Sequence, residues 1–410
     1  YVPRFDEDYA ATFAGDAFSC AIAEDVLDLI ERDAIVARAD GRGESLRRRL
    51  LEIQGAHPTV IAAVTGRGLM QGIVLNPDSV CKMFSLRMAE RHEMLGMVAA
   101  SFLLHRHSVR LLPTLSAFNT LRLEPSAYID DLAIEQLAKG LEAFCCAVEN
   151  SDSATLLDCL VDDEMEIAVA HRPETDLPTF FSDLEPPRPG AERVAFFGHF
   201  VLPERDIVLT DPSMQRLPPA ARCVLVDKLM QLTEMKPTPI FSRHLFDHRV
   251  WFNFVFFAVD APTIEHQMRS GHTALLVERI QAGVDLAAAA GCRVGALGAY
   301  TSIVTDDGRA LLPPSGMQLT TGNTMTVAVG MRRVHDACVR WAIELDREDV
   351  EIAVIGATGN IGSAIAEQFA TTTHCRHLTL VARQPERLRR LSDRLAQSCT
   401  TVGQPSPVLK

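Results

Sequence analysis

Three glycines, spaced three residues apart, most constrain how the end of this chain can fold. Gly356 ends the strand-like run VEIAVIG, Gly359 follows it, and Gly362 lies at the start of the helix-like run IGSAIAEQFA. A second strand-like run, HLTLVAR, comes next and ends at Arg383. A diphosphate needs backbone N–H groups that it can approach closely and a helix N-terminus that supplies partial positive charge. The sequence therefore predicts the first half of a Rossmann dinucleotide-binding domain over residues 346–410.

The end of the second predicted strand indicates which dinucleotide would bind. An Asp or Glu there would accept a hydrogen bond from the 2′-hydroxyl of NAD, but Arg383 takes this place. Because a guanidinium can pair with a 2′-phosphate, the sequence favours NADPH. The alternative is that the arginines of this region form the solvated face of the last helix. We keep that interpretation for Arg389, Arg390 and Arg394.

Charge and proline divide the chain. Residues 1–150 carry 15 Lys and Arg against 21 Asp and Glu, residues 151–190 carry 2 against 10, and residues 191–410 carry 23 against 22. The stretch 171–190 holds five prolines. Because an acidic, proline-rich segment repels itself and stays extended, we expect a linker at 151–190 between separately folded units. A long surface loop of one domain is the alternative that fits less well.

The first region follows an α+β pattern. Apolar residues at helical spacing predict two helical runs within 20–53, separated by DGRG at 40–43. Further expected elements are a β-pair at 60–75, a helix at 80–107, strands at 109–115 and 118–125, and a helix at 130–148.

The region after the linker follows an α/β pattern. Buried strands are expected at 193–202, 223–229 and 250–259, and a covering helix at 273–291. The expected fold class is therefore α/β with several domains. An α+β domain at 1–150 precedes an α/β domain at 191–345 and the half Rossmann domain.

The composition excludes several kinds of function. The formal net charge of −13 argues against broad binding to nucleic acids or anionic membranes, since both need a basic face. The most apolar run, at 250–259, is too short to span a membrane. The ten cysteines form no CxxC motif and indicate neither a zinc site nor a disulfide framework. We expect a cytoplasmic protein without a metal site that acts on small molecules.

Two polar stretches interrupt the apolar runs upstream of the glycine-rich turn. They are LGAYTSIVTDDG at 297–308 and LTTGNTMTVAVG at 319–330, and each contains glycines that permit tight turns. Such residues can line a pocket floor that hydrogen-bonds a carbonyl or a nicotinamide amide. Alternatively, Thr320, Thr321 and Asn323 cap a helix that follows them. The sequence leaves both interpretations open.

These stretches carry a resemblance to a known family. LGAYTSIV, TTGNTMTVAVG, VIGATGNIGSAIA and LTLVARQPERLRRL resemble, in order and spacing, long-chain fatty acyl-ACP reductases, which make fatty aldehydes with NADPH. FFGHF at 196–200 resembles that family's opening segment, and the resemblance covers 191–397. It implies NADPH contacts for Gly356, Thr358, Gly359, Asn360, Ile361, Gly362 and Arg383, and substrate contacts for Thr321, Gly322 and Asn323. No residue matches the family's acyl-accepting cysteine, because Cys399 falls in the last helix or the tail.

Residues 1–150 resemble the C-terminal small domain of class III pyridoxal-phosphate aminotransferases. The matching pieces are ATFAGDAFSCAIAEDVLDLI, VTGRGLMQGIVL and LRLEP. The resemblance implies that Thr12 hydrogen-bonds the cofactor phosphate of the neighbouring subunit, and that Arg122 serves the substrate carboxylate or orients the site. Asp16 stands where the family usually has Asn. The alternatives are a helix-entry cap for Thr12 and a surface or structural ion pair for Arg122.

The resemblance also implies what the chain lacks. The Schiff-base lysine of the family lies upstream of the matching stretch, and Lys82 and Lys139 fall in the wrong elements to replace it. Because that lysine carries the cofactor, normal transamination is not expected of this chain.

We therefore interpret the chain as a fragment of a fused enzyme, itself inactive because both catalytic residues lie outside it. A reductase would make an aldehyde from an acyl thioester or acyl carrier protein, and a dimeric aminotransferase would use an amino donor to convert it to an amine. The alternative is a non-catalytic NADPH-binding or scaffolding module. A complete epimerase-type or short-chain oxidoreductase would need a Tyr-x-x-x-Lys pair after the turn, but no Tyr follows Tyr300.

Overall fold

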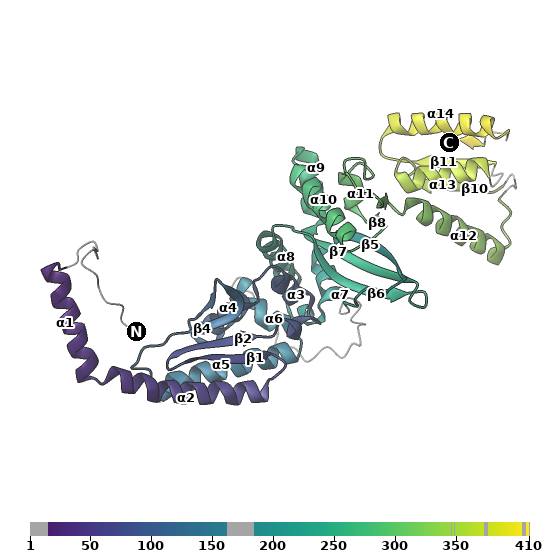
Figure 1. The fold of residues 1–410 in the computed structure, drawn as a ribbon. Coiled ribbons are helices and arrows are strands. Elements are labelled where there is room, and N and C mark those ends of the chain that lie inside the picture. The colour runs from purple at the N-terminus through teal and green to yellow at the C-terminus, as the bar shows by residue number, and fades with distance from the viewer. Residues whose placement is uncertain are drawn as a thin grey trace. The chain divides into compact units, whose positions relative to one another are not determined.

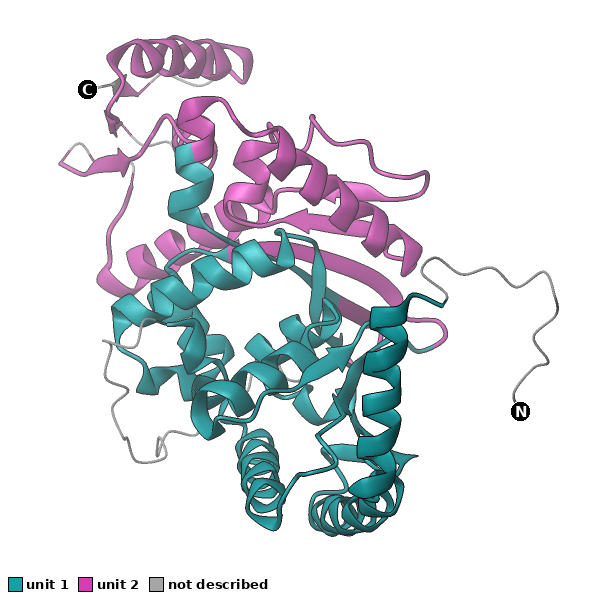
Figure 2. Cartoon of the chain, turned by 90° about the vertical axis from the view of Figure 1, so that its left-hand side faces the viewer, with its two compact units in different colours: residues 1–188, 200–244, 253–266 teal, residues 189–199, 245–252, 267–410 magenta. Residues whose placement is uncertain are grey.

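The computed structural model of the chain describes residues 15–161, 184–345, 347, 349–372, 376–403 and 407–409 (Figure 1). The chain forms two compact units (Figure 2). Unit 1 comprises residues 1–188, 200–244 and 253–266, and unit 2 comprises residues 189–199, 245–252 and 267–410. The fold is a mixture of helices and strands. None of the helices that the structure describes combines the length and hydrophobicity that crossing a membrane requires.

Unit 1 begins with helices and an antiparallel sheet. Its first elements are α1 (Ala17–Arg32), α2 (Ile35–Ala56), β1 (Ile61–Arg67), β2 (Met70–Leu75), η1 (Pro77–Val80), α3 (Phe84–Arg91), α4 (Leu95–His107), β3 (Leu112–Thr114), β4 (Ala117–Leu123) and α5 (Asp131–Glu149). Its later elements are α6 (Ser153–Leu157), η2 (Asp158–Leu160), α7 (Pro203–Thr210), η3 (Pro212–Arg216) and α8 (Pro219–Thr233). Strands β6 (Thr238–Leu245) and β7 (Val250–Asp260) have residues in both units.

The antiparallel sheet of unit 1 has one buried face. Its strand order is β1-β2-β4-β3, and α2, α4 and α5 pack together beside it (Figure 1). Alternate residues of β2 and β4 are buried, namely Ile73, Leu75, Leu121 and Leu123. This alternation follows from the pleat of a strand, which directs successive side chains to opposite faces. The residues between them lie on the other face of the sheet.

The helix break predicted at 40–43 is wrong. The break lies at Asp33 and Ala34, where Ala34 adopts a left-handed conformation with φ +47°, and α2 runs through both glycines of DGRG. Position 43 of the helix requires a residue without a side chain. A Cβ atom there would lie 2.3 Å from the carbonyl carbon of Gly68, so only glycine lets the hairpin approach α2 this closely.

Two further sequence predictions are wrong. The helix expected at 80–107 is split into α3 and α4, because Glu93 adopts a left-handed conformation with φ +62°. The run at 223–229, predicted as a strand, lies inside α8. The buried residues Ala221, Leu225 and Leu229 recur every four positions, which is helical spacing over a longer window than the run itself.

The first part of the predicted linker is folded. Residues 153–160 form α6 and η2, Leu156 and Leu157 are buried, and α6 packs against α4 and α5. At the other end of the predicted linker, Leu184 forms a β-bridge with Ser242. The stretch 162–183 lies outside the described residues, so an extended connection there stays a prediction.

Unit 2 contains two groups of parallel strands. Its first elements are β5 (Glu192–Phe200), the end of α9 (Ala261–Ser270), α10 (Ala274–Ala289), β8 (Val294–Leu297), α11 (Tyr300–Val304), β9 (Gln318–Thr320) and α12 (Asn323–Trp341). Phe200 and most of α9 belong to unit 1. Strand β8 pairs in parallel with β5 on one side and β9 on the other, so the carboxyl ends of these strands lie at one edge.

The end of the chain has the predicted order of strand, glycine-rich turn, helix, strand and helix. The elements are β10 (Glu351–Ile355), α13 (Asn360–Thr371), β11 (His377–Val381), α14 (Pro385–Thr401) and β12 (Val408–Leu409). The strands are parallel in the order β10-β11-β12.

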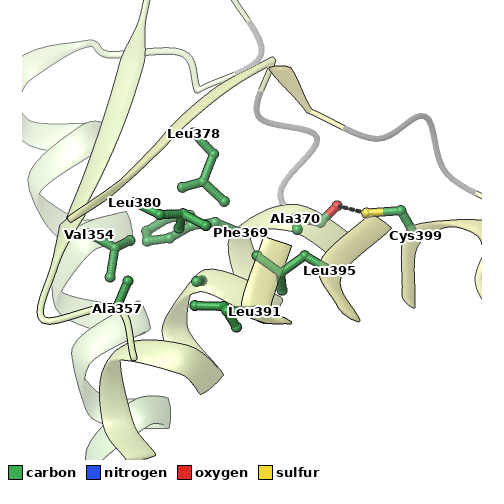
Figure 3. Packing of buried hydrophobic residues seen from close by; sticks show 10 residues of the cluster. Val354, Ala357, Phe369, Ala370, Leu378, Leu380, Leu391, Leu395 and Cys399 are labelled. Carbon is green, nitrogen blue, oxygen red and sulfur yellow. Dashed lines mark hydrogen bonds between the residues drawn. The ribbon is translucent and has the colours of Figure 1, made fainter. Parts of the chain in front are cut away.

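One hydrophobic cluster holds this segment together. Val354 and Leu380 of the strands pack with Phe369 of α13 and with Leu391 and Leu395 of α14 (Figure 3). The thiol of Cys399 closes the cluster by donating to the carbonyl of Ala370 at 3.3 Å. Both helices thus pack against the strands through the same core.

Candidate functional site

Arg122 lies on the sheet face of unit 1 that is opposite the buried one. Its neighbours in β4, Leu121 and Leu123, are buried, whereas the Arg122 side chain is 57% exposed. Its Nε lies 3.3 Å from a carboxylate oxygen of Glu124, two residues along the strand. Since an exposed ion pair of this kind contributes little to stability, the guanidinium can exchange this partner at small cost.

The strands beside Arg122 leave room around it. In the register of the sheet, Arg122 is opposite Gly72 of β2 and Leu112 of β3. Gly72 has no side chain to cover the arginine, and a Cβ there would lie 2.7 Å from Oγ1 of Thr65. The sequence had no signal for this arrangement, because register is a property of the folded sheet.

Arg122 also lines a cavity of about 250 Å³ at the end of β4. Arg110 and Glu124 add charge to its lining, and Leu46, Leu111, Leu123, Ile129, Ala133 and Leu137 form an apolar wall. An apolar wall with two arginines among the lining residues suits a small molecule that carries a carboxylate on a hydrocarbon chain.

The described residues do not complete a pyridoxal-phosphate site. Lys82 and Lys139 are exposed, and neither lines the cavity at Arg122. Thr12, which was assigned to the cofactor phosphate, lies outside the described residues. Asp16 has a structural role as the N-cap of α1, where its side chain accepts from the backbone N–H of Ser19 at 2.9 Å. That hydrogen bond lowers the pKa of the Asp16 carboxyl.

Comparison with known proteins gives matches in the region that contains Arg122. Residues 4–123 match the family Aminotransferase class-III. Acetylornithine aminotransferase from Prochlorococcus marinus (strain MIT 9313) is 33% identical over 136 residues, which are 33% of this chain and 29% of that protein. The mitochondrial acetylornithine aminotransferase of Saccharomyces cerevisiae is 29% identical over 144 residues, covering 35% of this chain and 28% of the yeast protein.

A solved structure of acetylornithine aminotransferase from Elizabethkingia anophelis has 22% identity and a TM-score of 0.28, covering 35% of this chain and 32% of that one. The family match and the curated relatives show that the N-terminal region is similar to class III aminotransferases of the acetylornithine and ornithine type. The chain spans less than a third of the length of these two curated relatives.

The glycine-rich turn of unit 2 has a specific backbone geometry. Gly356 adopts a left-handed conformation with φ +80°, and its N–H and that of Ala357 donate to the carbonyl of Val381 at 2.8 and 3.1 Å. A Cβ on Gly362 would lie 2.3 Å from the carbonyl oxygen of Gly356. Two of the three glycines are therefore needed for the turn itself and for the close packing of helix on strand.

Helix α13 begins directly after this turn. Gly359 is its N-cap, and among the residues that the structure describes no side chain accepts a hydrogen bond from the first turn of the helix. The N–H groups of Asn360, Ile361 and Gly362 have no acceptor within the helix, as is general for a first turn. Thr358 belongs to the turn that precedes them. These backbone N–H groups can donate hydrogen bonds to an anion.

Arg383 follows β11 with its side chain exposed, two residues before α14. Among the residues that the structure describes, Arg383 forms no ion pair, whereas Arg389 of α14 pairs with Glu386. No ion pair of Arg390 or Arg394 is described in α14 either, so a role of Arg383 at a dinucleotide stays a prediction.

The residues Thr321, Gly322 and Asn323 form the entry to α12. Gly322 is the N-cap, with φ +69°, and Asn323 is the first helical residue. The hydroxyl of Thr320 accepts from the N–H of Gly322 at 3.2 Å, and the hydroxyl of Thr321 accepts from the N–H of Asn323 at 3.4 Å. These bonds agree with the capping interpretation, and a contact with substrate stays a prediction.

The stretch LGAYTSIV forms a tight connection from β8 to α11, and a pocket floor there stays a prediction. Ala299 adopts φ +48° and ψ −125°, an unusual backbone conformation for a residue with a side chain. The hydroxyl of Thr301 donates to the carbonyl of Gly298, and that of Ser302 to the carbonyl of Ala299, at 2.7 and 2.9 Å. These two hydroxyls therefore serve the backbone of their own turn.

His199 of β5 is a residue of this edge that the sequence did not single out. It is 7% exposed, and its Nε2 accepts from the backbone N–H of Tyr300 at 3.1 Å. The hydrogen bond fixes the proton of the neutral ring on Nδ1. In the sequence, His199 was noted only as part of FFGHF. That motif does not indicate that residue 199 contacts residue 300.

Two buried cysteines, Cys145 and Cys292, are poor nucleophiles. Burial raises the pKa of Cys145 to about 12 and that of Cys292 to about 11, so both thiols are protonated at neutral pH. Among the described residues, no group of three or more His, Cys, Asp or Glu side chains is arranged to hold a metal ion.

Proposed function

We propose that the first region of this chain is the small domain of a class III aminotransferase, and that Arg122 binds the carboxylate of an amino acid substrate. The observation that supports this most directly is the position of Arg122 on the open sheet face, opposite Gly72 and at the rim of a cavity. The similarity of residues 4–123 to the aminotransferase family supports the same assignment.

The role of Arg122 follows from its charge and geometry. A guanidinium can bind a carboxylate with two parallel hydrogen bonds, which fixes the orientation of a substrate as well as its position. The substrate carboxylate would displace Glu124 from its exposed pair with Arg122. Since the cavity has no lysine, we assign no chemical step of transamination to the described residues.

Binding of N-acetylornithine to the complete 410-residue chain tests this proposal. Arg122→Gln should weaken binding about tenfold or more in isothermal titration calorimetry, because the charge-assisted contact is lost. Arg67→Gln changes another exposed arginine of the same sheet and should have no effect. The amide analogue of the ligand, which lacks the carboxylate, should bind the wild type and the Arg122 variant equally. Equal binding of N-acetylornithine to all three proteins would contradict the proposal.

For residues 346–410 we propose a second function, which is to bind NADPH for the reduction of an acyl thioester. The observation that favours it is the entry to α13, where Gly356 and Gly362 bring the turn close to the helix and no side chain caps the first turn. Arg383 would pair with the 2′-phosphate. The aldehyde formed by the reductase would then be the amino acceptor of the aminotransferase. The homodimer, the acyl carrier protein and the cytoplasmic location stay predictions.

Comparison of NADPH and NADH tests this second function. The wild-type chain should bind NADPH more tightly than NADH in a fluorescence titration, and Arg383→Gln should remove most of that preference. Arg390→Gln, an exposed arginine of α14, is the matched control and should keep it. A wild type that binds neither dinucleotide would refute the assignment.

A further inference from the structure

One acidic side chain lies beside the turn that we assign to the dinucleotide. Helix α11 ends in a loop where Asp306, Asp307 and Gly308 have φ values of +50°, +55° and +86°. The N–H of Asp307 donates to the carbonyl of Ser302 at 2.7 Å, and that of Gly308 donates to the carbonyl of Thr305 at 3.1 Å. These hydrogen bonds fix the backbone of the loop.

The carboxylate of Asp307 reaches the entry to α13. Its Oδ1 accepts from Nδ2 of Asn360 at 2.9 Å, and Asn360 is the first residue of that helix. The contact joins residues 53 positions apart within unit 2. A negative charge is thereby held beside the side chain of the first residue of α13, at the end of the helix whose backbone N–H groups have no partner within the helix. A carboxylate is favourable at this end of a helix for the same reason that a phosphate is.

We propose that Asp307 is an internal anion that competes with the dinucleotide diphosphate for the N-terminal end of α13. The inference rests on the proposed NADPH function and adds a residue that sets the affinity of the site. When the diphosphate binds, the carboxylate must leave Asn360 or remain beside two further negative charges. Either outcome weakens binding, so removal of this one charge strengthens it.

The neighbouring aspartate provides a matched control. Asp306 has the same left-handed backbone conformation and the same charge, but its carboxylate pairs with Arg309 at 3.4 Å. Asp306→Asn and Asp307→Asn therefore change the net charge equally. Only the second removes the charge that lies against Asn360.

Two neutral substitutions at position 307 separate competition from positioning. Asparagine keeps an acceptor for Asn360, and glycine removes it, while both residues tolerate a left-handed backbone. If Asp307 competes with the diphosphate, both variants bind more tightly than the wild type. If Asp307 instead positions Asn360, Asp307→Asn leaves binding unchanged and Asp307→Gly weakens it.

The experiment is a titration of the complete chain and its three variants with NADPH and with inorganic pyrophosphate. We expect Asp307→Asn and Asp307→Gly to lower the Kd of both ligands about tenfold, and Asp306→Asn to change it less than twofold. The gain should shrink at high salt, because salt screens exposed charges. Tighter pyrophosphate binding without NADPH binding would sink the NADPH function and keep the inference. NADPH binding that position 307 does not strengthen would overturn the inference alone, and failure of both ligands to bind any of the proteins would overturn both.

Discussion

At the scale of single residues, Asp211 is a buried acidic side chain of unit 1 whose two carboxylate oxygens both accept hydrogen bonds. It is 2% exposed and lies where η3, α3 and α6 meet. One carboxylate oxygen accepts from the backbone N–H of Ser85 at 3.3 Å, and the other accepts from the hydroxyl of Ser213 at 2.9 Å. The same hydroxyl accepts from the N–H of Ala154 at 3.1 Å. Asp211 therefore satisfies donors from segments far apart in the sequence.

Asp211→Ala should destabilise the chain by about 1–3 kcal/mol, because it leaves buried donors without an acceptor. Asp25→Ala in α1, an exposed position, should change the free energy of unfolding by no more than about 0.5 kcal/mol. Urea unfolding followed by circular dichroism measures both. Equal effects of the two substitutions would show that the Asp211 contacts contribute nothing.

The pH dependence of this site has a definite sign. Burial raises the pKa of Asp211 above that of the unfolded chain, and hydrogen bonds from the serines oppose the shift. The folded state therefore binds the proton more tightly, and the stability gained from protonation is lost as the pH rises through the folded pKa. As the pH rises above the ordinary Asp pKa of about 4, the wild type should lose stability relative to Asp211→Asn. A constant difference as the pH rises would contradict the assignment.

At the scale of elements, helix α2 shows why a local pattern can mislead. Two glycines within four residues are typical of a helix break, yet Gly41 and Gly43 both lie inside the helix. For Gly43 the reason is a contact with Gly68 of the β1–β2 hairpin, which is remote in sequence. Ala34, where the chain does break, has high intrinsic helix propensity, so propensity alone would not place a break there.

Alanine substitutions of the two glycines should have opposite effects. Gly41→Ala meets no atom within 4 Å and should stabilise the chain by about 0.5–1 kcal/mol through helix propensity. Gly43→Ala places its Cβ 2.3 Å from backbone atoms of Gly68 and should destabilise the chain by about 1–3 kcal/mol. Thermal unfolding of the two variants measures the difference. Two stabilising substitutions would mean that the hairpin is not held against α2.

At the scale of the whole molecule, the order of most elements could be predicted but the long-range contacts could not. Hydrophobic periodicity and turn residues predicted the hairpin of unit 1 and the segment around Gly356, because these patterns are local in the sequence. Resemblance pointed to Arg122. The side chains that complete its surroundings, and the approach of Asp307 to Asn360, depend on register and packing between distant segments. No window of the sequence contains that information.

The cysteines allow each unit to be followed separately. Cys145 is buried in unit 1 and Cys292 in unit 2, whereas Cys20 and Cys146 are exposed. Since the thiolate is the reactive form, the exposed pair should react with iodoacetamide much faster than the buried pair. Pulsed alkylation and mass spectrometry across a urea titration should show Cys145 and Cys292 becoming reactive as their units unfold. Rapid labelling of either one in native buffer would contradict its burial.

Helix α1 has a consequence for how the chain folds. Against the residues that the structure describes, none of its 16 residues is buried, although Phe18, Ile22 and Leu29 line one side of it. An isolated helix of this length is marginal in water, because nucleation is costly and little packing repays it. Helix α1 therefore contributes little to the folding nucleus of unit 1, and the rate of folding should depend on the sheet and its three packed helices.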